Sequence, residues 1–219
     1  MEKNIDYINL YKIQDEVLEL VFSLDTPFYL TGGTALHRFY YNLRYSDDLD
    51  FFTNNENFNE YIDQILFKLK EKEIPFSHPV KAKDFGRILV KDSLQIDFVN
   101  DRVFREGVSN IVDGFKIDNK RNIFANKISA LLGRDEEKDI FDIFSIINNE
   151  DFNWGEILEI ANKKTPVDKD LLIYRIDSFP LLWLNKIKII NPLDITKKHI
   201  KILVNDLLNE RSNSFVKNK

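Results

Sequence analysis

The pattern of apolar and polar positions divides the chain into two halves. Up to about residue 110, short apolar runs that indicate strands alternate with amphipathic stretches that indicate helices. After about residue 119, apolar residues recur at helical spacing. This order predicts an α+β fold, in which an N-terminal sheet with flanking helices precedes a C-terminal helical half. We expect two domains, residues 1–110 and residues 111–219.

The individual elements follow from the same periodicities. Helices are predicted at residues 5–22, 34–42, 58–72, 121–132, 136–148, 154–163, 168–177 and 194–210. Strands are predicted at residues 28–30, 49–52, 75–80, 87–90 and 94–99. The pattern at 107–114 is typical of a linker with some strand content, 179–190 fits a strand or a helix, and 212–219 is typical of a frayed end.

Composition narrows the class of protein. Hydrophobic residues make up 43% of the 219 residues and aromatics 13%, which suffices for a packed core. There is no cysteine, which excludes a disulfide framework and thiolate metal sites. No apolar run approaches the roughly 20 residues of a membrane span, and the N-terminus lacks the apolar core of a signal peptide. We therefore expect a soluble, cytoplasmic protein without a membrane partner.

Charge is distributed unevenly along the chain, whose net charge is −5. Residues 1–109 carry 13 Lys and Arg against 19 Asp and Glu, whereas residues 110–219 carry 18 against 17. The acidic N-terminal half would favour binding of divalent cations, and the lysines of the C-terminal half would favour binding of phosphates. Ordinary surface variation explains this difference about equally well.

Gly32-Gly33-Thr34 follows the apolar run at Phe28–Leu30. Two glycines after a strand allow a sharp turn and a close approach of the backbone to a ligand. The N–H groups that open the next helix could hold a phosphate, and Thr34 adds a hydroxyl. An ordinary turn remains an equally good interpretation of these three residues alone.

Asp48-Leu49-Asp50 opens the next predicted strand. Residues i and i+2 of a strand face the same side, so the two carboxylates project together. They repel each other unless a cation lies between them, and Mg²⁺ prefers such oxygen ligands. We expect Asp47 to face solvent or to cap. Taken alone, a surface position for the Asp48-Leu49-Asp50 motif is the more common outcome.

Asp97 lies between Ile96 and Phe98 in the predicted strand 94–99. A carboxylate among apolar neighbours is costly without a partner. If this strand adjoins that of Asp50, three carboxylates would form a cluster able to hold two metal ions for phosphoryl transfer. The alternative is an ion pair of Asp97 with Arg87 or Lys91.

These motifs together resemble those of a known family. The segments that carry the resemblance are GGTAL…SDDLDFF at 32–52, IDF at 96–98, Asn126-Lys127, and Lys138-Asp139-Ile140-Phe141-Asp142. They are similar to the AbiEii/AbiGii-type nucleotidyltransferase toxins, a group that includes the MenT-type toxins within the DNA polymerase β-like nucleotidyltransferase superfamily. The resemblance covers about residues 28–147 and implies a mixed sheet of the nucleotidyltransferase type.

The resemblance also implies roles for single residues. Asp48, Asp50 and Asp97 would bind Mg²⁺, as a two-metal site with Mn²⁺ as an alternative ion, and Asp97 would help to deprotonate the acceptor hydroxyl. Lys127 would reach the nucleotide phosphates, and Asp139 would orient Lys127 or the acceptor. Lys127, Arg134, Asp139 and Asp142 could instead form an ion-pair network between helices.

Nucleotide binding is implied for a second group of residues. The triphosphate would be held by Gly32, Gly33, Thr34, Lys127 and Arg38. Arg44 is a further candidate for lining the pocket. In this view the nucleoside triphosphate lies between the two halves of the chain.

The activity implied by the resemblance is metal-dependent transfer of a nucleoside monophosphate to an acceptor hydroxyl. The acceptor would be RNA, with tRNA 3′ ends as the expected target. The chain would be the toxin of a toxin–antitoxin or abortive-infection system, with a cognate antitoxin encoded separately.

Two alternatives remain open at this point. The protein could transfer nucleotides to a small molecule of the antibiotic type, or it could be a non-catalytic nucleotide-binding module. A basic patch in the helical half would favour RNA. The candidate lysines are Lys163, Lys164, Lys186, Lys188, Lys197, Lys198 and Lys201.

Overall fold

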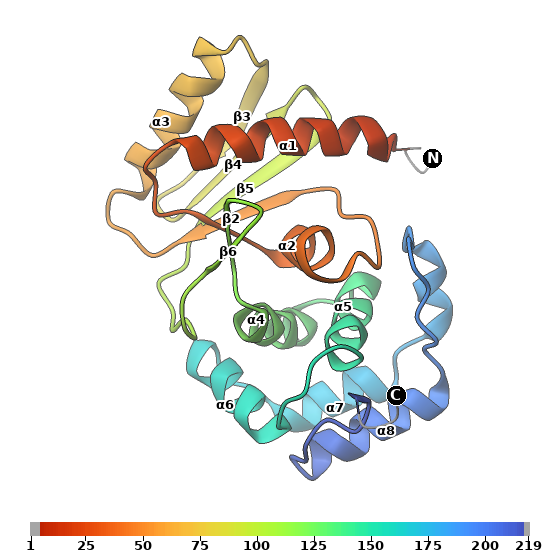
Figure 1. The fold of residues 1–219 in the computed structure, drawn as a ribbon. Coiled ribbons are helices and arrows are strands. Elements are labelled where there is room, and N and C mark those ends of the chain that lie inside the picture. The colour runs from red at the N-terminus through yellow and green to blue at the C-terminus, as the bar shows by residue number, and fades with distance from the viewer. Residues whose placement is uncertain (1–4, 217–219) are drawn as a thin grey trace. The chain divides into compact units, whose positions relative to one another are not determined.

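The chain folds into two compact units (Figure 1), and the computed structural model describes residues 5–216. The first unit takes the chain up to Phe39, together with Ser46–Arg102 and Ser109–Asp118. The second takes Tyr40–Tyr45, Val103–Val108 and the chain from Asn119 onwards. Each unit is thus assembled from separate segments of sequence. The division into domains at residue 110 stays a prediction.

The first unit is built on one mixed sheet. Its strands are β1 (Tyr29–Thr31), β2 (Leu49–Thr53), β3 (Phe76–Lys81), β4 (Phe85–Val90), β5 (Leu94–Asn100), β6 (Asn110–Val112) and β7 (Phe115–Ile117). Within the described residues they lie in the order β3-β4-β5-β2-β1-β7-β6. The pairs β2–β5 and β1–β7 are parallel and the other pairs are antiparallel. The expected α+β class with a mixed sheet is confirmed.

Two helices cover the apolar face of this sheet. Helix α1 (Tyr7–Ser23) packs against α3 (Phe58–Glu71), β5 and β7, and runs across the strands in Figure 1. The rings of Phe28, Phe51 and Phe98 meet beneath them, with the Phe28 and Phe98 centroids 5.2 Å apart. Because side chains alternate along a strand, these apolar positions leave their neighbours on the opposite face.

The second unit is helical. Its elements are α4 (Lys120–Gly133), α5 (Glu137–Ile147), α6 (Trp154–Lys164), α7 (Lys169–Asp177), the 3₁₀-helix η2 (Leu181–Lys186) and α8 (Lys197–Leu208). Helix α4 contacts α5, α6 and α7, while α8 contacts α6 and α7. Edge-on contacts among Phe124, Phe152 and Trp154, at centroid distances of 5.0–5.3 Å, fill the space beside α4. The helical half is confirmed.

One local expectation differs from the structure. The helix predicted at 34–42 is a short helix α2 (Gly32–Leu36), which continues as the π-helix η1 (His37–Tyr41). The segment at 107–114 contributes β6 and leads into β7, which pairs with β1. Finally, no described helix is long and apolar enough to cross a membrane.

The expectation of a frayed end at 212–219 was wrong for its described part. Asn213 is fully buried, and its side-chain amide donates to the carbonyl oxygens of Ile147 and Glu150, each at 2.7 Å. Ser214 donates to both carboxylate oxygens of Asp206 from its backbone N–H and its hydroxyl. Residues 217–219 lie outside the described residues. The described part of this segment is therefore fixed by hydrogen bonds that hydropathy does not reveal.

Candidate functional site

The turn after β1 lies directly against the acidic segment of β2. Gly32 has φ = +71°, a left-handed conformation that glycine adopts without strain. A Cβ at this position would meet the Asp50 Oδ2 atom well inside contact distance. Gly32 is therefore required both by its backbone angle and by the carboxylate of Asp50.

Thr34 ties the turn to the same segment. Its hydroxyl donates a hydrogen bond to the backbone carbonyl of Asp48 at 2.5 Å, and the residue is 1% exposed. Asp48 and Asp50 are half-buried, whereas Asp47 is exposed, as expected. The structure thus brings the predicted phosphate turn and the two predicted metal ligands together, with Thr34 as a link between them.

Sheet register places the third predicted carboxylate beside the other two. Asp50 of β2 is the direct partner of Asp97 on the parallel strand β5. Asp97 is in turn the partner of Arg87 on β4. All three side chains alternate with buried apolar residues, so they share the face of the sheet opposite to α1 and α3.

Arg87 holds Asp97 in a two-pronged ion pair. Its Nε and Nη2 atoms donate to the two carboxylate oxygens of Asp97, each at 2.6 Å. These hydrogen bonds raise the pKa of Arg87 against the opposing effect of burial, and the charges of Asp97, Asp48 and Asp50 raise it further. The predicted alternative, an ion pair of Asp97 with Arg87, is confirmed.

The donor atoms at this site suit a hard divalent cation. Asp48 and Asp50 supply carboxylate oxygens, the ligand type that Mg²⁺ prefers. Within residues 5–216, however, no three His, Cys, Asp or Glu side chains come close enough to hold one ion together. Asp97 is engaged by Arg87. The residues present therefore fit an ion at Asp48 and Asp50, while a third bond from Asp97 would have to compete with a guanidinium.

Arg38, predicted to contact the nucleotide, lies against α1. Its guanidinium donates to Gln14 at 3.0 Å and to Asp15 at 2.5 Å, and it stacks over the ring of Tyr11 at 4.4 Å. These contacts give Arg38 a structural role in fixing η1 to α1. Its role in nucleotide binding stays a prediction.

Lys127 and Asp139 belong to the second unit, where they form part of an ion-pair network. Lys127 Nζ lies 3.0 Å from Asp139 and 2.6 Å from Asp142. Arg134 donates to both oxygens of Asp139, at 2.7 and 3.0 Å. Arg44 donates to both oxygens of Asp142, at 2.7 and 2.8 Å. The inter-helix network considered from the sequence is confirmed, with Arg44 as an additional member.

Lys127 and the two carboxylates of this network are buried, and their charges shift one another's pKa values. The Asp139 and Asp142 side chains are 0% exposed and that of Lys127 is 8% exposed. Burial lowers the pKa of Lys127, but Asp142 and Asp139 outweigh it and the net shift is upward. Burial raises the pKa of Asp139, yet Lys127 and Arg134 hold it below its usual value of 3.8. Arg134 also pairs with Glu136 at 3.5 Å, so the three cations face three carboxylates.

One buried pair near the turn escaped sequence reasoning. The hydroxyl of Thr31 donates to Asp118 Oδ2 at 2.8 Å, and both residues are buried. Thr31 immediately precedes Gly32 and is the partner of Asp50 across the β1–β2 pair. A local signal existed, since Asp118 directly follows the alternating segment Phe115-Lys116-Ile117. Only the parallel pairing of β1 with β7, however, brings the two residues together.

Comparison with known proteins yields one family and several relatives. The family model described as "Nucleotidyl transferase AbiEii toxin, Type IV TA system" matches residues 19–212. An uncharacterized protein of Aquifex aeolicus (strain VF5) is 31% identical over 161 residues, which are 71% of this chain and 75% of that protein.

Among solved structures, the fold is similar to that of JHP933 from Helicobacter pylori. The TM-score is 0.67 at 21% identity, covering 97% of this chain and 94% of that one. MenT4, a nucleotidyltransferase toxin from Mycobacterium tuberculosis H37Rv, matches at a TM-score of 0.48 and 14% identity, covering 83% of this chain and 64% of that one.

Proposed function

Because the chain belongs to the AbiEii family of nucleotidyltransferase toxins, we propose that it transfers a nucleoside monophosphate to the 3′ end of a tRNA. Membership of the family implies a nucleoside triphosphate substrate and a cognate antitoxin. We assign metal binding to Asp48 and Asp50, with Mg²⁺ as the ion and Mn²⁺ as an alternative. The proposal places the reaction in the cytoplasm, where nucleoside triphosphates and tRNA are found together.

The observation that supports this proposal best is the position of Asp50. Its carboxylate lies against the Gly32 turn on one side, and Asp97 is its register partner on the other. The sheet thereby carries a pair of carboxylates directly beside a turn that allows a ligand to approach the backbone closely. A triphosphate with a bound divalent ion needs this combination of groups.

The proposed reaction is an in-line displacement at phosphorus. The oxygen of the acceptor hydroxyl forms a bond to the α-phosphorus, the bond from that phosphorus to the β-bridging oxygen breaks, and pyrophosphate leaves. Asp97 takes the proton of the hydroxyl. A bound divalent ion supplies charge stabilisation to the phosphate oxygens. The protein contributes the orientation of both substrates.

The other predicted roles form part of the same proposal. Gly33 and Thr34 would contact the triphosphate, and Lys127 would attract its phosphates. Asp142 and Asp139 raise the pKa of Lys127 against the effect of burial, so Lys127 keeps its positive charge, which supports attraction of an anion. Asp139, which accepts hydrogen bonds from Lys127 and Arg134, is assigned to orienting Lys127.

A labelling assay tests the proposal. Purified protein is incubated with each α-labelled nucleoside triphosphate, Mg²⁺ and total tRNA, and the label on RNA is measured. We expect Asp48→Ala to abolish labelling. The hydrogen bond of Thr34 should persist in this variant because it uses the backbone carbonyl of Asp48. Asp47→Ala, a change at the exposed neighbour, is the matched control and should retain labelling.

Other outcomes separate the alternatives. Labelling of an antibiotic-type small molecule in place of tRNA would replace the proposed acceptor while keeping the chemistry. Full labelling of tRNA by Asp48→Ala would refute the metal assignment. Nucleotide binding by the wild type without labelling of any acceptor would point to a non-catalytic nucleotide-binding module.

A further inference from the structure

Helix α7 and the 3₁₀-helix η2 leave large side chains on the surface of the second unit. Leu182 is 79% exposed, Tyr174 66% and Trp183 36%. None of the described residues of η2 is buried. Aromatic and aliphatic side chains gathered at the surface in this way mark a binding surface rather than a core.

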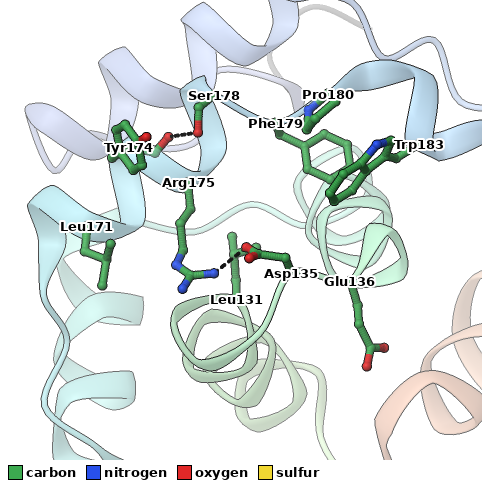
Figure 2. Close-up of a pocket in the computed structure, with 10 residues that line it drawn as sticks. All are labelled: Leu131, Asp135, Glu136, Leu171, Tyr174, Arg175, Ser178, Phe179, Pro180 and Trp183. Atoms are coloured by element: carbon green, nitrogen blue, oxygen red, sulfur yellow. Dashed lines mark hydrogen bonds and ion pairs between the residues drawn. The ribbon is translucent and has the colours of Figure 1, made fainter.

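Two cavities lie on either side of the Phe179-Pro180 segment that joins α7 to η2. The first has a volume of about 310 Å³ and is lined by residues that include Tyr174, Arg175 and Trp183 (Figure 2). The second has a volume of about 490 Å³, and Lys197 and Lys201 of α8 contribute to its wall. Both volumes fall within the range of ligand-binding pockets.

The aromatic rings of the first cavity are held in defined positions. Phe179 and Trp183 pack edge to face, with centroids 6.1 Å apart and an interplanar angle of 82°. Figure 2 shows the two rings side by side at one end of the cavity and Tyr174 at the other. Lys186 Nζ lies 4.8 Å from the centroid of the Trp183 ring. The contact with Phe179 thus fixes the orientation of the Trp183 indole, and the Lys186 ammonium lies within cation–π distance of it.

Arg175 supplies a donor within this cavity. Its Nη1 atom donates to the Arg134 carbonyl oxygen at 3.3 Å and to Asp135, as Figure 2 shows for Asp135. Its Nε atom is buried and has no hydrogen-bond partner among the described residues. Since a buried donor without a partner is costly, an anionic oxygen entering the cavity would relieve that cost.

The segment that carries α7, η2 and the start of α8 is basic although the chain as a whole is acidic. Residues 169–201 contain seven Lys and Arg against three Asp, in a chain with a net charge of −5. Lys197, Lys198 and Lys201 are all exposed on the first turns of α8. Lys164, expected in the same basic patch, is instead buried. The two cavities differ in the charges of their walls. Lys197 and Lys201 share the wall of the second cavity with Asp177. The wall of the first cavity contains Arg175 with Asp135 and Glu136. Positive charge is therefore concentrated at the second cavity.

We propose that this surface, made of Tyr174, Arg175, Phe179, Trp183, Lys197 and Lys201, binds unpaired nucleotides of the RNA acceptor. Bases stack on Trp183 and Tyr174, while Arg175 and the two lysines contact phosphates. Exposed rings interleaved with cations are typical of surfaces that bind single-stranded nucleic acid. Protein interfaces, by contrast, are depleted in lysine. The inference rests on the proposed function, because it takes RNA as the acceptor.

Binding of a short RNA tests the proposal separately from catalysis. The full chain is titrated, without nucleoside triphosphate or metal, into a fluorescently labelled single-stranded RNA of about eight nucleotides, within the usual site size. We expect Trp183→Ala to weaken binding about tenfold or more, as loss of one base stack does. Phe67→Ala is the matched control, since Phe67 is 69% exposed on α3 of the first unit.

Salt dependence isolates the lysine contacts. Loss of two phosphate contacts on a single strand lowers the slope of log K against log salt by about 1.4. We expect this decrease for the double variant Lys197→Gln/Lys201→Gln. Lys70→Gln/Lys72→Gln, which changes two exposed lysines of the first unit, should leave the slope as in the wild type.

Intrinsic fluorescence reports on the ring itself. The chain has two tryptophans, and Trp154 is 1% exposed. In a Trp154→Phe variant, unlabelled RNA should quench the remaining emission from Trp183. Retained helical circular dichroism establishes that this variant is folded.

The outcomes distinguish failure of this inference from failure of the proposed function. If tRNA is labelled but Trp183→Ala binds the oligonucleotide as tightly as the wild type, the surface is wrongly assigned and the function stands. Equal affinity for a duplex, or equal competition by a polyphosphate that lacks bases, also overturns the stacking proposal. So does a Trp183→Ala variant that loses binding to the cognate antitoxin while keeping its affinity for RNA.

Discussion

The two units treat buried charge in contrasting ways. On the sheet of the first unit, the guanidinium of Arg87 interacts electrostatically with three carboxylates, those of Asp48, Asp50 and Asp97. Asp97 retains 13% of its side-chain exposure and Arg87 retains 37%. This cluster is open to solvent and negative in sum.

The network of the second unit is closed, and its charges balance when Glu136, which pairs with Arg134, is counted. Lys127, Arg134 and Arg44 enclose two fully buried carboxylates, Asp139 and Asp142. A buried charge without its partner is strongly destabilising, so each member of this network depends on the others. The open cluster is thus suited to a ligand cation, whereas the closed network holds helices together.

The largest expected effect on stability lies in the closed network. Asp142→Asn removes the carboxylate that pairs with both Lys127 and Arg44. We expect the free energy of unfolding to fall by about 3–5 kcal/mol, because two buried cations lose their counter-charge. Urea denaturation measures the change. Asp194→Asn, at an exposed carboxylate of the same unit, is the control, and an equally small effect in both variants would contradict the closed network.

A smaller effect is expected from acid titration of the same network. The pKa of Asp139 is lower in the folded chain than its usual value of 3.8. Its contribution to stability is therefore fully present above that value and is lost as pH falls through the lower, folded-state pKa. Asp139→Asn should cost about 1.5–3 kcal/mol at pH 7. The difference from wild type should shrink below pH 4, and a constant difference down to pH 2 would contradict this assignment.

The smallest expected effect concerns Arg87 in the open cluster. Arg87→Gln removes a partly exposed ion pair, so we expect a loss of about 1 kcal/mol in unfolding free energy without metal. Removing that cation leaves three carboxylates to repel one another, and Mg²⁺ should then stabilise the variant more than the wild type. Thermal unfolding with and without Mg²⁺ measures both effects.

The control for Arg87 is a pair elsewhere on the same unit. Arg102→Gln breaks an exposed pair with Asp84 and should leave the response to Mg²⁺ unchanged. If Mg²⁺ stabilises the wild type as much as Arg87→Gln, then Arg87 does not compete with a cation for Asp97.

Periodicity predicted most helices and strands because each buries one face. The sequence pattern predicts a strand at 94–99 in which Asp97 lies between Ile96 and Phe98, and in the structure Asp97 lies on the opposite face to these two buried residues. The same pattern also supplied the ion pair with Arg87 as an alternative. What the pattern cannot supply is register: the direct pairing of Asp50 with Asp97 depends on two strands 47 residues apart.

Polar residues that are held by hydrogen bonds to distant parts of the chain could not be placed from the local sequence pattern. Asn213 lies in a polar stretch, yet its amide satisfies two carbonyl oxygens more than 60 residues away in sequence. Lys164 belongs to a charged run but is buried. The hydrogen bond between Thr31 and Asp118 could not be predicted from local sequence either, because it depends on the parallel pairing of β1 and β7. Polar residues of this kind are placed by tertiary structure rather than by hydropathy.

The pair of Arg44 with Asp142 has a consequence for synthesis on the ribosome. The two residues are separated by 98 positions, although they belong to the same compact unit. Arg44 therefore leaves the exit tunnel long before its counter-ion is translated. Until then the second unit cannot close around it, so assembly of that unit is deferred until α5 has emerged.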